Sequence, residues 1–391
     1  MLDLPADCST FLSWLLFHSA AISATKVSPS GDRYALRVNP SSGNLHPTEF
    51  HFVTRGVKDW QDGLYHYRAS SHMAEQRALG RLELPWPLDE APLVFVLTSI
   101  AWREAWKYRD RAYRYCLLDI GHAWQALELA AQAAGCEVVA YGGFDDDALS
   151  DALGLPDDEW PMLVVAIRGV PLGAADPVEP EWFGGDANVL SETVVPYPRI
   201  DGVHAATKSG RSAGQLQSPN GRSGFSESVV RRRRSALDFI GGKRSMSRKQ
   251  FDTLVDVKTR LIQLYAYVHL VDNVEPGLYR ITEGNLELLK AGDQRLMAAA
   301  LSLGQDLAGN ACVAFSMAAD LEQGYREAFF EAGAIGQHFY VAATSMGLAG
   351  TGIGAFYDDR VHEYLGLEPD QGQVVYHFAV GYPVPDDRLE E

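Results

Sequence analysis

Apolar runs recur in pairs along the chain and predict buried strands. The pairs begin at Met162 and Val374, at Leu93 and Ala311, and at Glu49 and Tyr265. The first pair, MLVVAIRG and VVYHFAVG, is a continuous apolar run rich in β-branched residues, which is typical of a strand buried on both faces. We therefore expect two halves, each with a mixed sheet and helices packed against it.

Helical spacing of apolar residues follows in the segments between these runs. Residues 119–134 have this spacing and end at Gly135, a residue suited to the position after a helix. The aspartates at 145–147 are suited to cap a second, short helix that stops at Gly154. Residues 11–24 are also apolar, but they lack a preceding basic region and include Ser13 and His18. We interpret this stretch as a core helix rather than a signal peptide.

An internal repeat links the two halves. Residues 119–155 align without a gap with residues 331–367, and 12 of the 37 positions are identical. DGLYHYR at Asp62 matches PGLYRIT at Pro276 at nearly the same offset. Two matches in the same order predict a domain duplication. We expect one half at residues 1–173, a surface or flexible linker rich in polar residues at 174–228, and the second half at 229–391.

Composition and charge restrict the classes of partner and site that we expect. The net charge of −17 argues against a nucleic-acid or anionic-membrane partner, because phosphate would be repelled. The four cysteines, Cys8, Cys116, Cys136 and Cys312, form no CxxC pair, so we expect neither a disulfide framework nor a metal site. No run reaches the length of a membrane span, and a reducing cytoplasm fits this cysteine content.

Two polar segments are not shared by the halves. RVNPSSGNLHPTEF, residues 37–50, occurs only in the first half, and RRRRSALDF, residues 231–239, occurs only in the second. The first predicts a tight turn with free backbone N–H groups, and the second offers guanidinium groups and a hydroxyl at a helix start. Each segment alone is more often an ordinary loop or a solvated patch.

Together with DGLYHYR, KYRDRAYRY, LDIGHAWQAL, EAGAIGQHFYVAA and GLAGTGIGAF, these segments resemble the nitroreductase superfamily, and specifically its SagB/ThcOx-type dehydrogenases. The resemblance covers most of both halves. It implies an α+β, nitroreductase-like fold whose tandem duplication forms an intramolecular pseudo-dimer. It also implies one composite FMN site between the halves, while the pseudo-symmetric second site would be vestigial.

The resemblance assigns the FMN-binding residues segment by segment. They are Arg37, Pro40, Ser41, Ser42 and Asn44 in the first half, and Arg233, Arg234, Ser235, Gly352, Ile353 and Gly354 in the second. One departure from the family pattern is Leu237, where an arginine is frequent; Arg388 is a candidate replacement.

Lys107 and Tyr108 match the pair that supplies general base and acid in azoline-oxidising members. Such a lysine needs a lowered pKa. A solvated lysine beside a packed tyrosine is the alternative, and the repeat places Ala319 and Asp320 at the equivalent positions. Further polar and aromatic candidates, more often packed than functional, are His46, His51, His122, Trp102, Trp106 and Trp124.

Three functions remain open at this point. The first is an FMN-dependent dehydrogenase that acts on a peptide or natural-product intermediate, with azoline-to-azole oxidation as its type reaction. The second is a nitro- or quinone-reductase that uses NAD(P)H, although no GxGxxG follows a strand. The third is a degenerate flavin protein that serves as a scaffold in a modification complex. The chain is expected to be a monomeric pseudo-dimer or a homodimer.

Overall fold

The computed structural model describes residues 2–4, 9–85, 91–173, 179–184, 188, 191–208, 214–219, 224–368 and 372–390. Contacts divide the chain into two compact units. Unit 1 comprises Met1–Ser23 and Leu36–Gln217, and unit 2 comprises Ala24–Ala35 and Ser218–Glu391. The boundary thus falls within the expected linker, but a short N-terminal segment belongs with the second unit.

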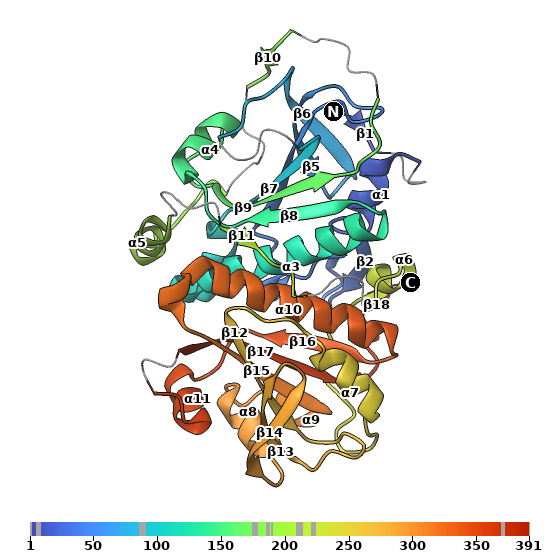
Figure 1. The fold of residues 1–391 in the computed structure, drawn as a ribbon, viewed down its shortest axis with the longest axis vertical. Coiled ribbons are helices and arrows are strands. Elements are labelled where there is room, and N and C mark those ends of the chain that lie inside the picture. The colour runs from blue at the N-terminus through green and yellow to red at the C-terminus, as the bar shows by residue number, and fades with distance from the viewer. Residues whose placement is uncertain are drawn as a thin grey trace. The chain divides into compact units, whose positions relative to one another are not determined.

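The sheet of unit 1 has the strand order β1-β6-β5-β4-β7-β9-β8-β11, and β10 also pairs with β6 (Figure 1). Its six main strands are β4 (Thr48–Thr54), β5 (Gly63–Arg68), β6 (Met73–Leu79), β7 (Leu93–Ser99), β8 (Glu137–Tyr141) and β9 (Trp160–Arg168). The short outer strands are β1 (Leu2–Asp3), β10 (Glu181–Trp182) and β11 (Gln215–Leu216). The helical segments are α1 (Phe11–Phe17), η1 (Ser42–Asn44), α2 (Trp102–Tyr108), η2 (Arg109–Arg111), α3 (Ala112–Ala133), α4 (Asp146–Leu153) and α5 (Pro198–Thr207).

The sheet of unit 2 has the order β14-β13-β12-β15-β17-β16. Its strands are β12 (Ile262–Val268), β13 (Gly277–Thr282), β14 (Asn285–Ala291), β15 (Val313–Ala319), β16 (Ala349–Ile353) and β17 (Gln373–Gly381). Its helical segments are α6 (Glu227–Arg232), α7 (Arg248–Val255), α8 (Arg295–Leu301), α9 (Asp306–Asn310), η3 (Leu321–Gln323), α10 (Tyr325–Ser345) and α11 (Asp358–Leu365). A separate three-stranded sheet joins β18 (Leu389–Glu390), β2 (Ile22–Val27) and β3 (Arg33–Arg37).

The main strands follow the same order in both units, which agrees with the sequence repeat. Each of the three predicted strand pairs forms corresponding strands, β9 and β17, β7 and β15, and β4 and β12. The expectation of mixed sheets was wrong, because every recorded pair of named strands is antiparallel.

One long helix lies along each sheet, α3 in unit 1 and α10 in unit 2 (Figure 1). Nearly all of the residues in both helices are buried, so each helix is apolar around most of its circumference. The predicted helix at 119–134 begins earlier than expected, at Ala112, and Gly135 follows its end with a φ of 83°. The cap at Asp145 and the left-handed stop at Gly154 are confirmed.

Equivalent acidic residues on these two helices hold different loops. Asp119 on α3 accepts hydrogen bonds from the backbone N–H and the hydroxyl of Ser42. Glu331, at the matching position of α10, accepts from the backbone N–H groups of Arg260, Leu261 and Ile262. A carboxylate at this position therefore positions the segment before the first central strand in each unit.

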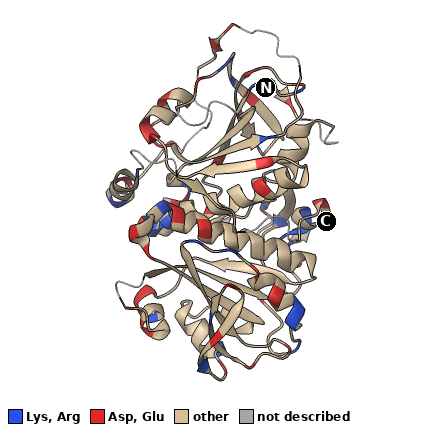
Figure 2. Ribbon diagram, in the orientation of Figure 1, with Lys and Arg blue, Asp and Glu red and all other residues tan. Residues whose placement is uncertain are grey.

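The described residues of the linker are mostly exposed, as expected of a segment that runs along the surface, and they include α5, β10 and β11. Two local predictions were wrong. The apolar stretch at 11–24 forms a helix only to Phe17, and β2 begins at Ile22, within a segment with β-branched residues. The arginine run ends α6 rather than starting a helix, which suits the negative end of the helix dipole. In Figure 2 the basic residues of α6 are blue on the ribbon.

Candidate functional site

The predicted Pro-Ser-Ser-Gly-Asn turn of unit 1 has an unusual backbone. Pro40 and Ser41 precede η1, and Gly43, Asn44 and His46 have φ values of 57°, 61° and 50°. Positive φ is uncommon for residues other than glycine, and its cost must be offset by surrounding contacts. Such strain concentrates at functional sites, so this turn is a candidate site.

Several hydrogen bonds hold the turn in this conformation. The Ser42 N–H lies 3.1 Å from both carboxylate oxygens of Asp119, and the Ser42 hydroxyl lies 3.0 Å from one of them. The His46 N–H donates to the Ser41 hydroxyl at 2.8 Å. The Asn44 side-chain oxygen is 3.0 Å from Nε2 of the His46 ring. The turn is therefore rigidly positioned.

Lys107 and Tyr108 lie directly against this turn. A Cβ atom on Gly43 would lie 2.5 Å from the Tyr108 hydroxyl and 2.8 Å from Lys107 Nζ. Only glycine leaves room for both groups at this position. The next residue, Arg109, also has a positive φ of 53°. The structure thus brings together the turn and the predicted catalytic pair within one unit.

The helix that carries this pair has no equivalent in unit 2. The strand ends Ser99 and Ala319 occupy matching register positions, opposite Thr48 and Ile262. Residues 100–111 then form α2 and η2 before α3, whereas residues 320–324 contain only η3 before α10. The proposed equivalence of Lys107 and Tyr108 with Ala319 and Asp320 was therefore wrong, because Ala319 is the last residue of a strand. Unit 1 carries an additional helix at this point.

Two buried carboxyl groups act on the predicted catalytic pair, and sequence analysis did not single them out. Glu104 is fully buried and Asp119 is 2% exposed. Burial and the nearby Asp119 raise the pKa of Glu104, although Lys107 and Ser41 act in the opposite direction. Burial also raises the pKa of Asp119, against the hydrogen bonds from Ser41 and Ser42. Position 104 precedes Lys107 by three residues, which was a usable signal for a shared helix face.

A buried polar network supports the other side of the turn. Arg103 donates to the backbone oxygen of His46 at 3.0 Å and pairs with Glu49. Glu49 also pairs with His66 at 2.8 Å, and the charges of Glu49 and Arg103 act on the half-buried Arg37. Arg37 therefore belongs to a charge network beside the turn.

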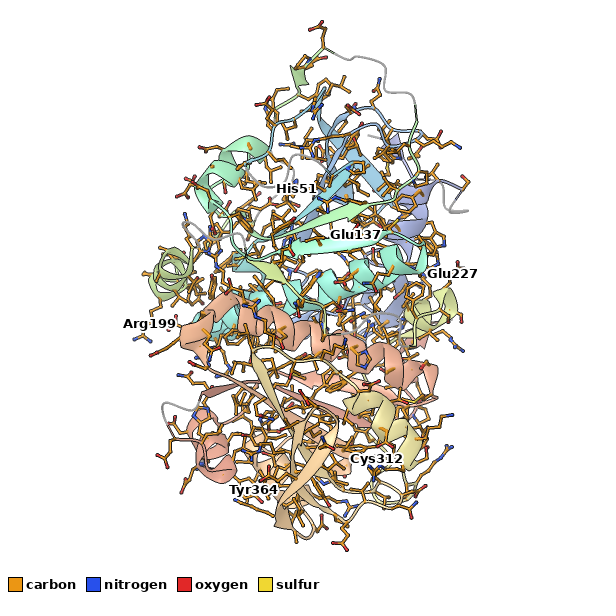
Figure 3. All side chains as sticks on the ribbon, viewed as in Figure 1. His51, Glu137, Arg199, Glu227, Cys312 and Tyr364 are labelled. Carbon is orange, nitrogen blue, oxygen red and sulfur yellow. The ribbon has the colours of Figure 1, made fainter. Side chains whose placement is uncertain are left out.

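The network continues along the sheet to His51, which Figure 3 labels on β4. His51 Nε2 lies 2.7 Å from Glu159, which also accepts from Thr98 at 2.6 Å and from Asn188 at 2.9 Å. The prediction that His51 is a packed residue is confirmed, because its exposed fraction is 1%.

The predicted residues of unit 2 gather around Tyr340, which sequence analysis missed. The Tyr340 hydroxyl lies 2.7 Å from the Ser235 hydroxyl and accepts from the Gly352 N–H at 3.1 Å. The Arg233 guanidinium lies over the Tyr340 ring, 4.9 Å from its centre. The Ala236 N–H donates to Gly350 O at 2.9 Å. The Arg-Arg-Ser segment and the glycine-rich strand are thus adjacent within this unit.

Small residues are required on the glycine-rich strand. A Cβ on Gly352 would overlap the Tyr376 hydroxyl, and a Cβ on Gly350 would lie 2.6 Å from the Phe378 ring. Ile353 ends β16 and is buried, and Gly354 follows it. This stretch is therefore an edge strand whose glycines let the backbone approach aromatic side chains of the neighbouring strand closely.

Positive charge accumulates at the end of α6. Arg233 is 3% exposed, and burial lowers its pKa. Burial and the charges of Arg233 and Arg231 lower the pKa of Arg234 to about 10. Arg234 donates to the backbone oxygens of Arg231 and Arg233 at 2.9 and 2.6 Å. Guanidinium groups that repel one another in this way are suited to bind an anion such as a phosphate.

Arg388 does not share this setting. Its guanidinium donates to Asp386 at 2.7 and 2.9 Å, and Asp386 also pairs with Lys26 at 2.7 Å. Leu237 is about half exposed. The proposed replacement of the missing arginine by Arg388 therefore finds no support in its contacts.

No group of His, Cys, Asp or Glu among the described residues is arranged to hold a metal ion. Within the same residues, no helix combines the length and apolar character that a membrane crossing requires. Cys116, Cys136 and Cys312 are free thiols, while Cys8 lies outside the described residues.

Comparisons with known proteins agree with this architecture. A structure from Anabaena variabilis, described as a nitroreductase, matches 95% of this chain and 88% of its own chain with a TM-score of 0.78 and 26% identity. A protein of Methanocaldococcus jannaschii, also described as a nitroreductase, is 26% identical over 145 residues, which cover 35% of this chain and 72% of that protein.

A second curated relative is the microcin B17-processing protein McbC of Escherichia coli. It is 25% identical over 146 residues, which cover 34% of this chain and about half of McbC, 54%. The model of the nitroreductase family matches residues 19–170 and 259–382, one segment from each part of the repeat. The chain therefore belongs to the nitroreductase family of oxidoreductases.

Proposed function

We propose that the protein is an FMN-dependent dehydrogenase that oxidises a peptide or small-molecule intermediate, with azoline-to-azole oxidation as the type reaction. The observation that carries this proposal is the position of Lys107 and Tyr108. They lie on a helix that only unit 1 has, against a strained turn that leaves room for them through Gly43. A helix that the repeated fold does not need is a candidate for chemistry rather than for stability.

The residues present fit a flavin mononucleotide. The buried Arg233 and the neighbouring, half-buried Arg234 are suited to its phosphate or to the electron-rich edge of its ring. The glycine-rich backbone of Gly352, Ile353 and Gly354 is suited to lie close to an aromatic ring system. We propose that these residues, with Arg37, Pro40, Ser41, Ser42, Asn44, Arg234 and Ser235, hold one FMN per chain. Bound flavin would supply hydride acceptance.

Lys107 and Tyr108 would move the protons of the reaction. Burial raises the pKa of Tyr108 above its ordinary range, so the phenol stays protonated and serves as a hydrogen-bond donor. Lys107, as the free amine, would accept the proton that leaves the substrate carbon. Both groups lie against Gly43 of the turn, which Asp119 holds through Ser42, so that little reorganisation would be needed during the reaction.

The likeness to McbC supports a peptide intermediate as substrate, because that relative processes microcin B17. It covers only one third of this chain, so the substrate class stays part of the proposal. The competing reaction is NAD(P)H-driven reduction of nitro compounds or quinones. The two reactions differ in the direction in which the substrate exchanges electrons with the flavin.

The test begins with the protein reconstituted with excess FMN and freed of unbound flavin. We expect one FMN per chain, and two bound equivalents would contradict the proposed site. Anaerobic mixing with an azoline-containing peptide should bleach the flavin absorbance, and NAD(P)H should bleach it much more slowly. Fast bleaching by NAD(P)H together with inert azoline peptides would favour the reductase instead.

Variants then test the proton-transfer pair. Lys107→Ala and Tyr108→Phe should lower the rate of peptide oxidation by about 10²- to 10⁴-fold, with FMN binding unchanged. Lys58→Ala, at an exposed lysine of the same unit, is the matched control and should leave the rate unchanged. Equal rates for Lys107→Ala and the control would refute the role of Lys107.

A further inference from the structure

The carboxyl group of Glu104 is buried, but within the described part of the chain it makes no hydrogen bond that would stabilise the fold. Its exposed fraction is 0%, and neither carboxyl oxygen has a partner in hydrogen-bonding geometry among the described residues. A buried polar group in this state costs the folded protein free energy. A leucine at position 104 would avoid most of that cost. The carboxyl group therefore requires an explanation other than stability.

Its surroundings link it to the predicted catalytic pair. Glu104 precedes Lys107 by three residues and Tyr108 by four on α2, so all three lie on one face of that helix. On α3, which packs against α2, Asp119 and Cys116 face Glu104. Tyr115, also on α3, interacts with Tyr108. The Ser41 hydroxyl of the turn lowers the pKa of both Glu104 and Asp119.

The two carboxyl groups are in unequal positions. Asp119 accepts three contacts from Ser42, at 3.1, 3.1 and 3.0 Å, and these favour its charged form. Glu104 has no comparable donors. Both carboxyl groups are buried and the charge of Asp119 acts on Glu104, so the two cannot both ionise without strong repulsion, and the proton belongs mainly on Glu104.

We propose that Glu104 and Asp119 hold a single proton between them and that Glu104 is thereby a positioning residue for Lys107. With one proton shared, Lys107 faces one negative charge instead of two. Its ammonium then releases a proton more readily and yields the free amine that accepts the substrate proton. This role rests on the proposed function, whereas the shared proton itself does not.

The variant Glu104→Gln tests the shared proton directly, because it keeps the shape of the side chain and is always neutral. Infrared spectra at neutral pH should show one protonated-carboxyl carbonyl band in the wild type that is missing in Glu104→Gln. The wild type should also lose thermal stability relative to the variant as pH rises from about 5 to about 9. The folded Glu104 retains a proton that the unfolded carboxyl has already lost.

Chemical labelling tests the effect on Lys107 without any turnover. The rate at which an amine-reactive reagent modifies Lys107 at pH 7, read by peptide mass spectrometry, reports its free-amine fraction. Wild type and Glu104→Gln should agree within about twofold, because Glu104 is already neutral. If Glu104 were charged, its removal would raise the labelling rate by about tenfold or more.

At alkaline pH the rates of Lys107 labelling in wild type and Glu104→Gln should differ. Once Glu104 ionises in the wild type, its charge holds Lys107 as the ammonium, so Glu104→Gln should label faster there. Glu128→Gln is the matched control, a buried carboxyl on α3 that lies about 13 Å further along the helix from Asp119. It should reproduce the wild-type labelling profile of Lys107.

The outcomes separate the two proposals. An unchanged carboxyl band, a stability difference that does not vary with pH, or a tenfold rise in labelling at pH 7 would overturn the shared proton. A missing band with identical labelling profiles at alkaline pH would overturn the positioning role. The expected band and labelling results, combined with no oxidation of any azoline peptide, would leave this inference intact and defeat the proposed reaction.

Discussion

At the scale of single residues, Gly43 decides how the candidate site is built. Its φ of 57° and the absence of a side chain let the turn approach Lys107 and Tyr108 closely. Both atoms that a Cβ would meet are the ends of side chains, so they can move aside. The effect of a substitution should therefore appear in catalysis more than in folding.

We expect Gly43→Ala to lower the rate of substrate oxidation by about 10²-fold, because an added Cβ displaces the Lys107 amine and the Tyr108 hydroxyl. The positive φ should cost only about 1 kcal/mol of unfolding free energy. Steady-state kinetics and urea denaturation measure the two effects. Gly56→Ala is the matched control, since Gly56 has a φ of 65° and open space around it. Equal kinetic effects of both variants would contradict this reasoning.

At the scale of elements, strand β4 connects the core to the site through its polar face. Glu49 and His51 alternate with buried apolar residues along β4, and they pair with His66 and Glu159. Burial alone would raise the pKa of Glu159, but His51, Thr98 and Asn188 outweigh it and lower the pKa to about 2. The carboxylate is therefore charged in the folded protein wherever its partners remain in place.

The lowered pKa of Glu159 predicts that the stability of the fold depends on pH. The contribution of Glu159 is fully present above about pH 4, the ordinary glutamate range, and is lost as pH falls toward 2. Glu159→Gln should lower the unfolding free energy by about 3 kcal/mol at pH 7, because it leaves His51 with a broken buried pair. Urea denaturation should show this difference shrinking as pH is lowered toward 2.

The control for that measurement is Glu137→Gln. Glu137 is exposed on β8, is labelled in Figure 3, and lies 4.0 Å from Arg168. Exposed pairs contribute little, so the control should change stability by less than about 1 kcal/mol. A difference for Glu159→Gln that stays constant with pH would contradict the assignment of its charge.

The elements differ in how far the sequence could predict them. The strands at Met162 and Val374 were predicted because a continuous β-branched run has few alternatives, and Asp145 and Gly154 marked their helix by cap chemistry. The extra helix α2 was not predicted, because the gap-free repeat aligned it with a strand end. The direction of the arginine run was wrong because basic residues suit a helix end at least as well as a helix start.

At the scale of the whole molecule, the division into units does not follow the order of the chain. Residues Ala24–Ala35 belong to unit 2, although they lie between segments of unit 1. There β2 pairs with β18, and Lys26 and Arg388 share Asp386. The hydrogen bonds from Arg388 and the charge of Lys26 lower the pKa of Asp386 despite partial burial. The hairpin formed by β2 and β3 ends at Arg37, shortly before the Pro-Ser-Ser-Gly-Asn turn.

We expect Asp386→Ala to loosen this hairpin, because it removes the group that Lys26 and Arg388 share. The loss of about 1 kcal/mol should increase tryptic cleavage after Arg33 about fivefold. Mass spectrometry of the fragments gives the rates. Asp387→Ala, at the exposed neighbouring residue, should leave the cleavage rate unchanged. Cleavage rates that do not differ between the two variants would show that Asp386 does not hold the hairpin.

This placement of the hairpin was beyond the reach of the sequence. Local patterns predict strands and caps, but the partner of an edge strand depends on contacts hundreds of residues away, as with Lys26 and Asp386. The same limit applies to the site. The turn and the arginine run were found from residue types, whereas Tyr340 became visible only when distant segments lay together.

The shared carboxylate of Asp119 and Glu331 has a consequence for how such a chain can diversify. Asp119 accepts from one backbone N–H as well as from the Ser42 hydroxyl, and Glu331 accepts from backbone N–H groups, so the backbone part of each contact does not depend on loop identity. The carboxylate on the helix can therefore bind loops of different composition, and the sheet does not have to change. After a gene duplicates, one copy can drift at its loop while the other keeps its chemistry, and neither copy loses its framework.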